Sequence, residues 1–247
     1  MEMERSKARA VASTEGTEPQ GKDKIVERSL LSSLRGESRR ALLALGTVER
    51  LPRRHAIAAQ GEPPRSFLLV DSGRVKLERK SGERALPLGH RGPGQMVGET
   101  AVGGAALATE DATVLDDVEG LSIPIGALRT QLAADPALQA ALAAAIVTQH
   151  RLIEQRLEGL LLQGVEARLG AFLLDAAERW GQPHREGQVL TAPFTHAEIA
   201  LLIGSTRETV TLVLGKLKRE GVIGFDRRRI ILRDPGQLEQ RLAGPAP

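Results

Sequence analysis

The sequence predicts an α+β fold: a small antiparallel β-barrel, then a long helix, then a helix-turn-helix that ends in a basic hairpin. Three observations predict this order. Short apolar stretches separated by turn residues occupy residues 48–125, which is typical of an all-β barrel or sandwich. An Ala- and Leu-rich stretch follows at 137–162. Two short amphipathic stretches joined by Gly204 then occupy 195–219.

The first segment, residues 1–24, is polar and nearly free of bulky apolar side chains. Such a segment buries too little surface to offset the entropy of ordering it, so we expect a disordered tail. Residues 25–45 then have the spacing of an amphipathic helical region. Its expected buried residues are Leu30, Leu31, Leu34, Leu42, Leu43 and Leu45.

Turn residues divide the predicted barrel, whose domain we place at residues 25–136. They occur at 61–64, 71–73, 81–83 and 91–94. Residues 71–73 and 80–83 are expected to be hairpin loops between antiparallel strands. Gly92, Gly94 and Gly98 lie between predicted strands and lack the following helix and Lys of a phosphate-binding loop, so we interpret them as turns.

The long helix, placed at 137–163, is predicted to mediate dimerisation. Ile146, Ile153 and Leu160 are seven residues apart, and 25 helical residues would span roughly 37 Å. The predicted interface consists of Leu142, Ile146, Ile153, Leu157 and Leu160. A second copy of the helix is the simplest partner for this stripe; packing on the barrel alone is the alternative. His150, beside the stripe, is interpreted as an interface residue rather than a metal ligand.

The last domain, placed at 164–247, begins with a helix at 165–180, a turn region at 181–187 and a short strand at 189–191. Thr195 and Glu198 have the spacing of a capping box, which starts a helix. Gly204 ends that helix, and Ser205 or Thr206 caps the next one. The second helix is expected to bury Val210, Val213, Leu214 and Leu217, and to expose Thr206, Arg207, Glu208 and Thr211.

The exposed edge of the second helix has the chemistry of a DNA-binding surface. Arg207 can donate two hydrogen bonds to guanine, Glu208 can accept one from cytosine, and Thr211 can meet a thymine methyl or a phosphate. Residues 205–233 hold eight Lys/Arg against three acidic residues, a net charge of +5, whereas the whole chain is +3. The predicted DNA-contact residues are Thr195, Ser205, Thr206, Arg207, Glu208, Thr211, Lys216, Lys218, Arg227, Arg228 and Arg229. The alternative is that Arg207 and Glu208 are only a solvated surface pair.

Several classes of function lack support in the sequence. There is no Cys, which excludes disulfides, thiol catalysis and cysteine-ligated iron–sulfur clusters. No nucleophile–base pair, metal-ligand spacing or phosphate-binding loop is present, so we expect no enzyme, no metal and no cofactor. No signal peptide and no 18-residue apolar run appear, so we expect a cytoplasmic protein without a membrane partner.

The order of these parts resembles the Crp/Fnr family of bacterial transcription regulators. The pattern EIAxxIGSTRETVT at Glu198–Thr211 is similar to the helix-turn-helix of that family, and Gln60-Gly61-Glu62, Gly73 and Gly98-Glu99 resemble turns of its β-roll. The resemblance covers residues 28–235. It implies a cyclic-nucleotide-binding-type β-roll (an antiparallel jelly-roll), a dimerisation helix and a winged helix-turn-helix. It also implies a homodimer that binds double-stranded DNA and contacts RNA polymerase.

The effector pocket implied by the resemblance departs from the cyclic-nucleotide pattern. Family members that bind cyclic AMP follow Gly-Glu with an Arg-Ser or Arg-Thr pair that neutralises the phosphate. This chain keeps Gly98 and Glu99 but has Glu110 and Asp111 at the later position, and it has Ile153 and Glu154 where the base would bind. We expect repulsion of a cyclic phosphate, no nearby replacement cation, and DNA binding without cyclic AMP. The effector is therefore unknown.

A second departure lies in the recognition helix. Where the cyclic AMP receptor's pattern has a second Arg that contacts guanine, this chain has Leu212, which can donate no hydrogen bond.

Three hypotheses about the function remain open. They are a DNA-binding regulator with no ligand or another effector, the same regulator gated by a cyclic nucleotide in a rearranged pocket, and an enzyme or cyclic-nucleotide sensor without a DNA role.

Overall fold

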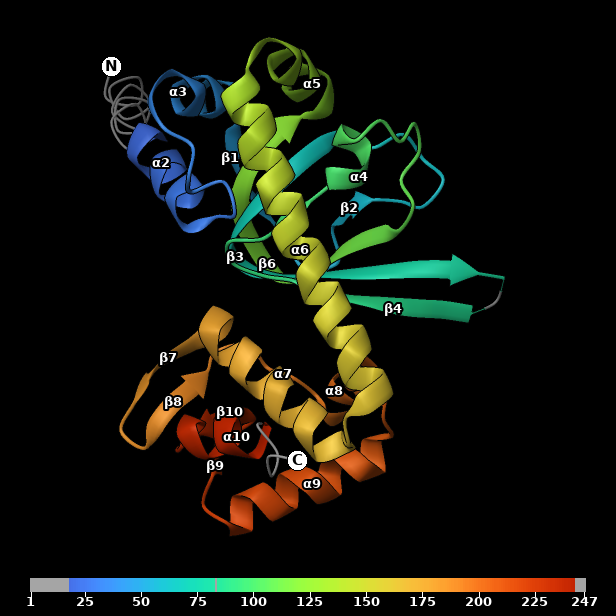
Figure 1. The fold of residues 1–247 in the computed structure, drawn as a ribbon, viewed down its shortest axis with the longest axis vertical. Coiled ribbons are helices and arrows are strands. Elements are labelled where there is room, and N and C mark those ends of the chain that lie inside the picture. Colours follow the sequence, from blue (N-terminus) through green and yellow to red (C-terminus); the bar gives the residue numbers. More distant parts are fainter. Residues whose placement is uncertain (1–17, 83, 243–247) are drawn as a thin grey trace, which may run out of the picture. The chain divides into compact units, whose positions relative to one another are not determined.

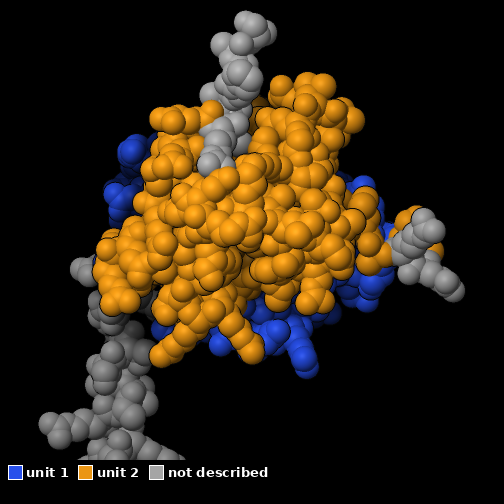
Figure 2. All heavy atoms as spheres, turned by 90° about the horizontal axis from the view of Figure 1, so that it is seen from below, with its two compact units in different colours: residues 1–80, 91–146 blue, residues 81–90, 147–247 orange. Residues whose placement is uncertain are grey.

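The computed structural model describes residues 18–82 and 84–242. The chain divides into two compact units, residues 1–80 with 91–146 and residues 81–90 with 147–247 (Figure 2). One long helix continues from the first unit into the second, and the boundary lies between Ile146 and Val147. Each unit has its own hydrophobic core.

The chain enters the first unit through two helices, α2 (Glu18–Arg28) and α3 (Gly36–Leu45). The predicted disordered tail is wrong for residues 18–24, which are helical, while residues 1–17 lie outside the described part of the chain. The helix is anchored because Ile25 and Val26 are buried in the core, and because Arg39 Nε donates to Asp23 Oδ1 over 2.7 Å. Of the six leucines predicted to be buried, Leu31, Leu34 and Leu42 are buried and the others pack against the core partly exposed.

The predicted antiparallel β-domain is confirmed (Figure 1). Its strands are β1 (Thr47–Leu51), β2 (Ala56–Ala58), β3 (Ser66–Ser81), β4 (Arg84–Arg91), β5 (Met96–Val97) and β6 (Asp111–Pro124). The sheet order is β1-β6-β3-β4, with β2 on β6 and β5 on β3. The inward face of β3 and β6 supplies Phe67, Leu69, Leu121 and Ile123 to the core.

Residues 71–73 do not form the predicted hairpin loop. They lie within β3, where the register against β6 shifts between Val70 and Arg74. Gly73 adopts φ 83°, and a Cβ atom there would overlap the carbonyl oxygen of Asp117, so the glycine permits a bulge at a close approach of two strands. β3 therefore continues to Ser81, and β4 begins at Arg84 after Gly82 and Glu83, the latter outside the described residues.

The helix α5 (Ile125–Ala134) was not expected from the sequence. It precedes α6 (Pro136–Leu162), which is the predicted long helix. The first half of α6 packs on the core of the first unit through Leu138, Ala141, Leu142 and Ala145. Leu142 is only 6% exposed there, so its predicted place in a dimer interface is wrong. No single helix in the described ranges is long and apolar enough to cross a membrane; α5 and α6 pass that test together, but a 118° bend separates them.

The second half of α6 carries large apolar side chains that remain exposed. Exposed large hydrophobic residues along it are Ile146, Val147, Leu152, Ile153, Leu157, Leu160, Leu161 and Leu162. Leu160 also touches the turn at Gly204, since a Cβ atom on that glycine would clash with the leucine's side chain.

Besides most of β4 and the end of α6, the described part of the second unit contains four helices and a four-stranded sheet ordered β7-β8-β10-β9. The helices are α7 (Val165–Trp180), α8 (His196–Ile203), α9 (Arg207–Arg219) and α10 (Pro235–Leu242); the strands are β7 (Gly181–His184), β8 (Gly187–Leu190), β9 (Ile223–Asp226) and β10 (Arg229–Leu232). The turn predicted at 181–187 is instead a hairpin, because Gln182 pairs with Val189 and the two strands continue the sheet. Phe194 closes the core, with its ring 5.1 Å from Phe172 and 5.4 Å from Trp180.

Candidate nucleic-acid interface and effector site

The helix-turn-helix is built by local hydrogen bonds that the sequence specifies. The Thr195 hydroxyl accepts from the Glu198 amide over 3.1 Å, and Glu198 Oε2 accepts from the Thr195 amide over 2.7 Å. Gly204 follows α8 with φ 62°, and Thr206 caps α9 by accepting from the Thr209 amide over 3.2 Å. The capping box and the turn are confirmed, and Thr206 rather than Ser205 is the cap. The hydroxyls of Thr195 and Thr206, both predicted DNA contacts, are thus committed to helix starts.

The helix α9 separates a buried face from an exposed one. Val210, Leu214 and Leu217 are buried in the core of the second unit. Arg207 and Glu208 are exposed in the first turn, and their side chains make no hydrogen bond or ion pair with any residue that the structure describes. Both remain available to a ligand.

Thr211 is exposed on the next turn, but its hydroxyl is already engaged. It donates to the Arg207 carbonyl oxygen over 2.8 Å and lies 2.8 Å from His196 Nδ1. These contacts tie the middle of α9 to its own first turn and to the start of α8. A phosphate contact by Thr211 would have to compete with them.

The positive charge predicted for residues 205–233 is partly neutralised by acidic residues outside that segment. Lys216 Nζ lies 2.6 Å from Glu166 Oε2 in α7, and Arg233 Nε donates to Glu186 Oε2 over 3.0 Å. Arg233 lowers the pKa of Glu186 through this hydrogen bond and its charge. The remaining cations are Arg207, Lys218, Arg219, Arg227, Arg228 and Arg229.

Three of those arginines form the predicted wing between β9 and β10. Asp226 pairs with Arg229, so Arg227 and Arg228 form a two-residue loop. Arg227 adopts φ 54°, a left-handed conformation that is unfavourable for a residue with a Cβ atom. All three side chains are exposed. In the strand β9 that leads into this loop, the ring of Phe225 has its centre 5.7 Å from Lys218 Nζ of α9.

Arg168 in α7 is a structural residue of this site that the sequence analysis missed. Its guanidinium donates to the carbonyl oxygens of Gln163, Ile203 and Gly204 over 2.5, 2.8 and 3.1 Å. It therefore joins the end of α6 to the turn before α9. Its position within the amphipathic helix 165–180 gave no signal for this role, because the carbonyl groups come from a distant segment.

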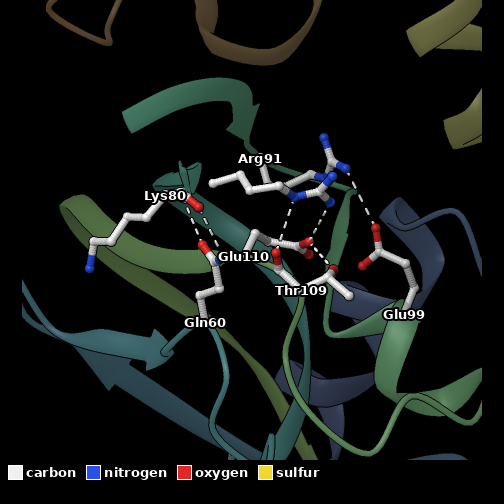
Figure 3. A network of polar contacts seen from close by, with 7 residues as sticks. Gln60, Lys80, Arg91, Glu99, Thr109 and Glu110 are labelled. Carbon is white, nitrogen blue, oxygen red and sulfur yellow. Dashed lines mark hydrogen bonds and ion pairs between the residues drawn. The ribbon is translucent and has the colours of Figure 1, made fainter. Parts of the chain in front are cut away.

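The predicted effector residues of the first unit surround a set of ion pairs. Gly98 adopts φ 97°, and a Cβ atom there would lie 2.8 Å from the Ser66 carbonyl oxygen, so only glycine fits. Glu99 begins α4 (Glu99–Val102) and pairs with Arg91, with Nη2 to Oε1 at 3.5 Å (Figure 3). The two side chains are 12% and 16% exposed, and Arg91 Nε is buried without a hydrogen-bond partner among the described residues.

Glu110 and Asp111 are also paired, because both face cations at the end of β3. Glu110 lies 3.7 Å from Arg79, which also donates to the Thr109 carbonyl oxygen over 3.1 Å. Asp111 lies 2.6 Å from Lys80 and accepts from the Gln60 amide over 2.8 Å. The Lys80 ammonium and then the Gln60 amide hold the pKa of Asp111 below its usual value, and Asp111 raises the pKa of Lys80.

The expectation that no cation stands near these carboxylates is therefore wrong. Arg79, Lys80 and Arg91 each match one of the three acidic residues. The sequence could not show this, because the pairing depends on the register of β3 after its bulge. An anionic ligand would meet a neutralised cluster rather than bare negative charge, and it would compete with Glu99 and Glu110 for the guanidinium groups.

Ile153 and Glu154, the other two predicted effector residues, belong to the second unit. Ile153 is 53% exposed, and Glu154 Oε1 lies 3.2 Å from His150 Nε2 on the same face of α6. Among the described residues no group of three or more His, Asp or Glu side chains is arranged to hold a metal ion.

Comparisons with known proteins assign a family to the β-domain and to the helix-turn-helix domain. A family model described as a cyclic nucleotide-binding domain matches residues 48–135, and one described as a Crp-like helix-turn-helix domain matches residues 167–241. The CRP-like cAMP-activated global transcriptional regulator of Mycobacterium tuberculosis is 30% identical over 191 residues, which cover 77% of this chain and 85% of that protein. This chain belongs to the Crp/Fnr family.

Other Crp/Fnr proteins are also similar to most of this chain. The transcriptional regulator LdrP of Thermus thermophilus is 31% identical, with 81% of this chain and 98% of LdrP covered. A solved Crp/Fnr-family regulator, also from Thermus thermophilus, is 30% identical and has a TM-score of 0.65, over 81% of this chain and all of that one. The Crp/Fnr chain described here thus has the fold of these transcription regulators and a helix-turn-helix DNA-binding domain. Its cyclic-nucleotide-binding-type domain carries the ion pairs described above.

Proposed function

We propose that this protein is a dimeric, sequence-specific transcription regulator that binds a pseudo-palindromic DNA operator through α9 and needs no cyclic AMP. The observation that carries the proposal is the exposed Arg207–Glu208 pair at the start of α9. A guanidinium and a carboxylate in that position match the acceptors of guanine and the amino group of cytosine in the major groove. The alternative is that Arg207 and Glu208 are only a solvated surface pair. That alternative does not explain why three exposed arginines of the wing occur in the same unit.

The basic wing supports contact with the DNA backbone. Arg227, Arg228 and Arg229 are exposed, and Arg227 keeps an unfavourable backbone conformation that a glycine would adopt without strain. Phosphates of the DNA backbone are ligands that such a cluster of guanidinium groups can bind and neutralise.

The uncovered stripe of α6 supports the dimer. Ile146, Ile153 and Leu157 lie on one side of the helix and are exposed, although large apolar side chains are normally buried. A second copy of α6 would cover them. The resulting dimer would also carry two α9 helices, one for each of two half-sites about one turn of DNA apart.

A second candidate is supported by Arg91, whose side chain is largely buried. Its Nε has no hydrogen-bond partner in the described part of the chain, and its guanidinium is close to Glu99. An anionic ligand that displaced this glutamate would therefore find a cation already in place. Gating by a cyclic nucleotide in this rearranged pocket is the alternative to a regulator that needs no ligand.

In either case we propose RNA polymerase as the partner at the promoter, the cytoplasm as the site of action, and no catalytic role.

In vitro selection of DNA by the purified protein, without added ligand, tests the proposal. We expect enrichment of a pseudo-palindrome. The variant Arg185→Ala, which removes an exposed arginine far along the chain from α9, is the control and should select the same sequence. Enrichment of no sequence would refute the proposal. Enrichment only after addition of cyclic AMP would favour the second candidate.

A further inference from the structure

An exposed leucine lies in the middle of the proposed DNA-contact surface. Leu212 is 72% exposed, whereas the other two leucines of α9, Leu214 and Leu217, are 1% and 0% exposed. Leaving an isobutyl group in water forgoes the stabilisation that burial would give. No residue in the described part of the second unit covers it.

Leu212 lies on the exposed side of α9. At about 100° per residue, Leu212 lies about 160° from the buried Val210 and only about 40° from the exposed Glu208. It follows Glu208 by one turn, a rise of about 6 Å, which corresponds to about two base pairs at 3.4 Å each. A helix that presents Glu208 to a base edge therefore presents Leu212 to the same groove.

The chemistry of this side chain limits what it can recognise there. It has no hydrogen-bond donor or acceptor, so it can contact neither a phosphate nor a guanine edge productively. The one apolar group that the major groove displays is the C5-methyl group of thymine. Arg207, Lys218 and Arg219 are exposed on the same helix, and their positive charge favours DNA over an apolar protein surface as the partner of this helix.

We infer that Leu212 is a specificity-determining residue that contacts the methyl group of a thymine within about two base pairs of the base contacted by Glu208. This inference rests on the proposed function. The resulting half-site combines a guanine and a cytosine contacted by the first turn of α9 with a thymine contacted by the second.

Replacement of thymine by uracil in the selected operator tests the inference, because it removes only the methyl group. Binding would be measured by fluorescence anisotropy for each thymine in turn. At one thymine per half-site we expect about a fourfold weakening for the wild type, the ratio that corresponds to about 0.8 kcal/mol for one methyl group. A 5-methylcytosine at the same position should retain more affinity than cytosine.

The variant Leu212→Ala supplies the decisive comparison, since its exposed position leaves the fold intact, as circular dichroism would check. It should bind the thymine and uracil operators equally, and keep the guanine preference attributed to Arg207. Equal binding of all thymine and uracil operators by the wild type would overturn the inference while leaving the proposed function standing. A methyl effect that persists in Leu212→Ala would also overturn it. Absence of any sequence-specific binding by the wild type would instead refute the proposed function.

Discussion

Arg168 Nε donates a hydrogen bond to the carbonyl oxygen of Ile203 over 2.8 Å, across 35 residues of sequence. The same guanidinium bonds Gln163 at the end of α6 and Gly204 in the turn of the helix-turn-helix. Helix ends leave carbonyl oxygens without partners, and a single arginine here satisfies three of them. The end of the long helix and the turn before α9 are therefore joined through one side chain.

Arg168→Ala should destabilise the second unit and weaken DNA binding, because carbonyl groups lose charge-assisted hydrogen bonds and the turn before α9 loosens. We expect a decrease of about 2 kcal/mol in the free energy of unfolding, measured by urea denaturation. Arg185→Ala, which removes an exposed arginine with a 3.7 Å ion pair, should change it by less than about 0.5 kcal/mol. Equal stabilities of the two variants would show that the three bonds do not matter.

Saturating cyclic AMP should change the operator affinity by less than about threefold, about 0.7 kcal/mol. The reason is that Glu99 and Glu110 already occupy Arg91 and Arg79, the cations that a cyclic phosphate would need. Anisotropy titrations with and without the nucleotide measure this. A tenfold tightening that disappears in Arg91→Gln would contradict the prediction and support gating by a cyclic nucleotide.

Ile153→Asp should convert a dimer into a monomer and abolish operator binding, because it would place a carboxylate in an apolar interface. Gln155→Asp introduces the same charge on the opposite side of α6 and serves as the matched control, since it should remain dimeric. Sedimentation velocity at micromolar concentration separates the two outcomes. A monomeric wild type, or a dimeric and active Ile153→Asp, would show that this stripe is not the interface.

Arg207→Ala and Arg228→Ala should weaken DNA binding in different ways. The first should cost about 1–3 kcal/mol per half-site and relax the preference for guanine at one position. The second should weaken all sequences about equally and reduce the salt slope by about one unit for each phosphate that is no longer neutralised. Binding-site selection and salt titration of both variants test this. If Arg228→Ala abolishes the base preference and Arg207→Ala keeps it, α9 is not the recognition element.

Asp111→Asn should lower the stability of the first unit at neutral pH but much less in acid. Lys80 and the Gln60 amide depress the pKa of Asp111 in the folded protein, so its carboxylate stabilises the fold above its unfolded pKa of about 3.9. That contribution disappears as the pH falls through the lower, folded pKa. Urea midpoints of the two proteins should therefore converge well below pH 4. Asp71→Asn, which removes no ion pair with another described residue, is the control.

The helix-turn-helix was predictable because its determinants are local. Thr195 and Glu198 cap α8 across three residues, Gly204 supplies the left-handed turn, and the spacing of Val210, Leu214 and Leu217 fixes which face of α9 is buried. The exposure of Arg207 and Glu208 follows from that spacing. These interactions act within one or two helical turns, so the order of residues was sufficient to specify them.

Only the tertiary structure decided the features that join distant segments. The bulge at Gly73 depends on the approach of Asp117, and it sets the register that brings Arg79 and Lys80 to Glu110 and Asp111. Leu142 belongs to the same apolar stripe in sequence as Ile153, yet it is buried because the first half of α6 packs on the core of the first unit. Periodicity shows which side of a helix is apolar. It does not show whether that side is covered by the chain itself or left for another molecule, because this depends on what the rest of the chain packs against it.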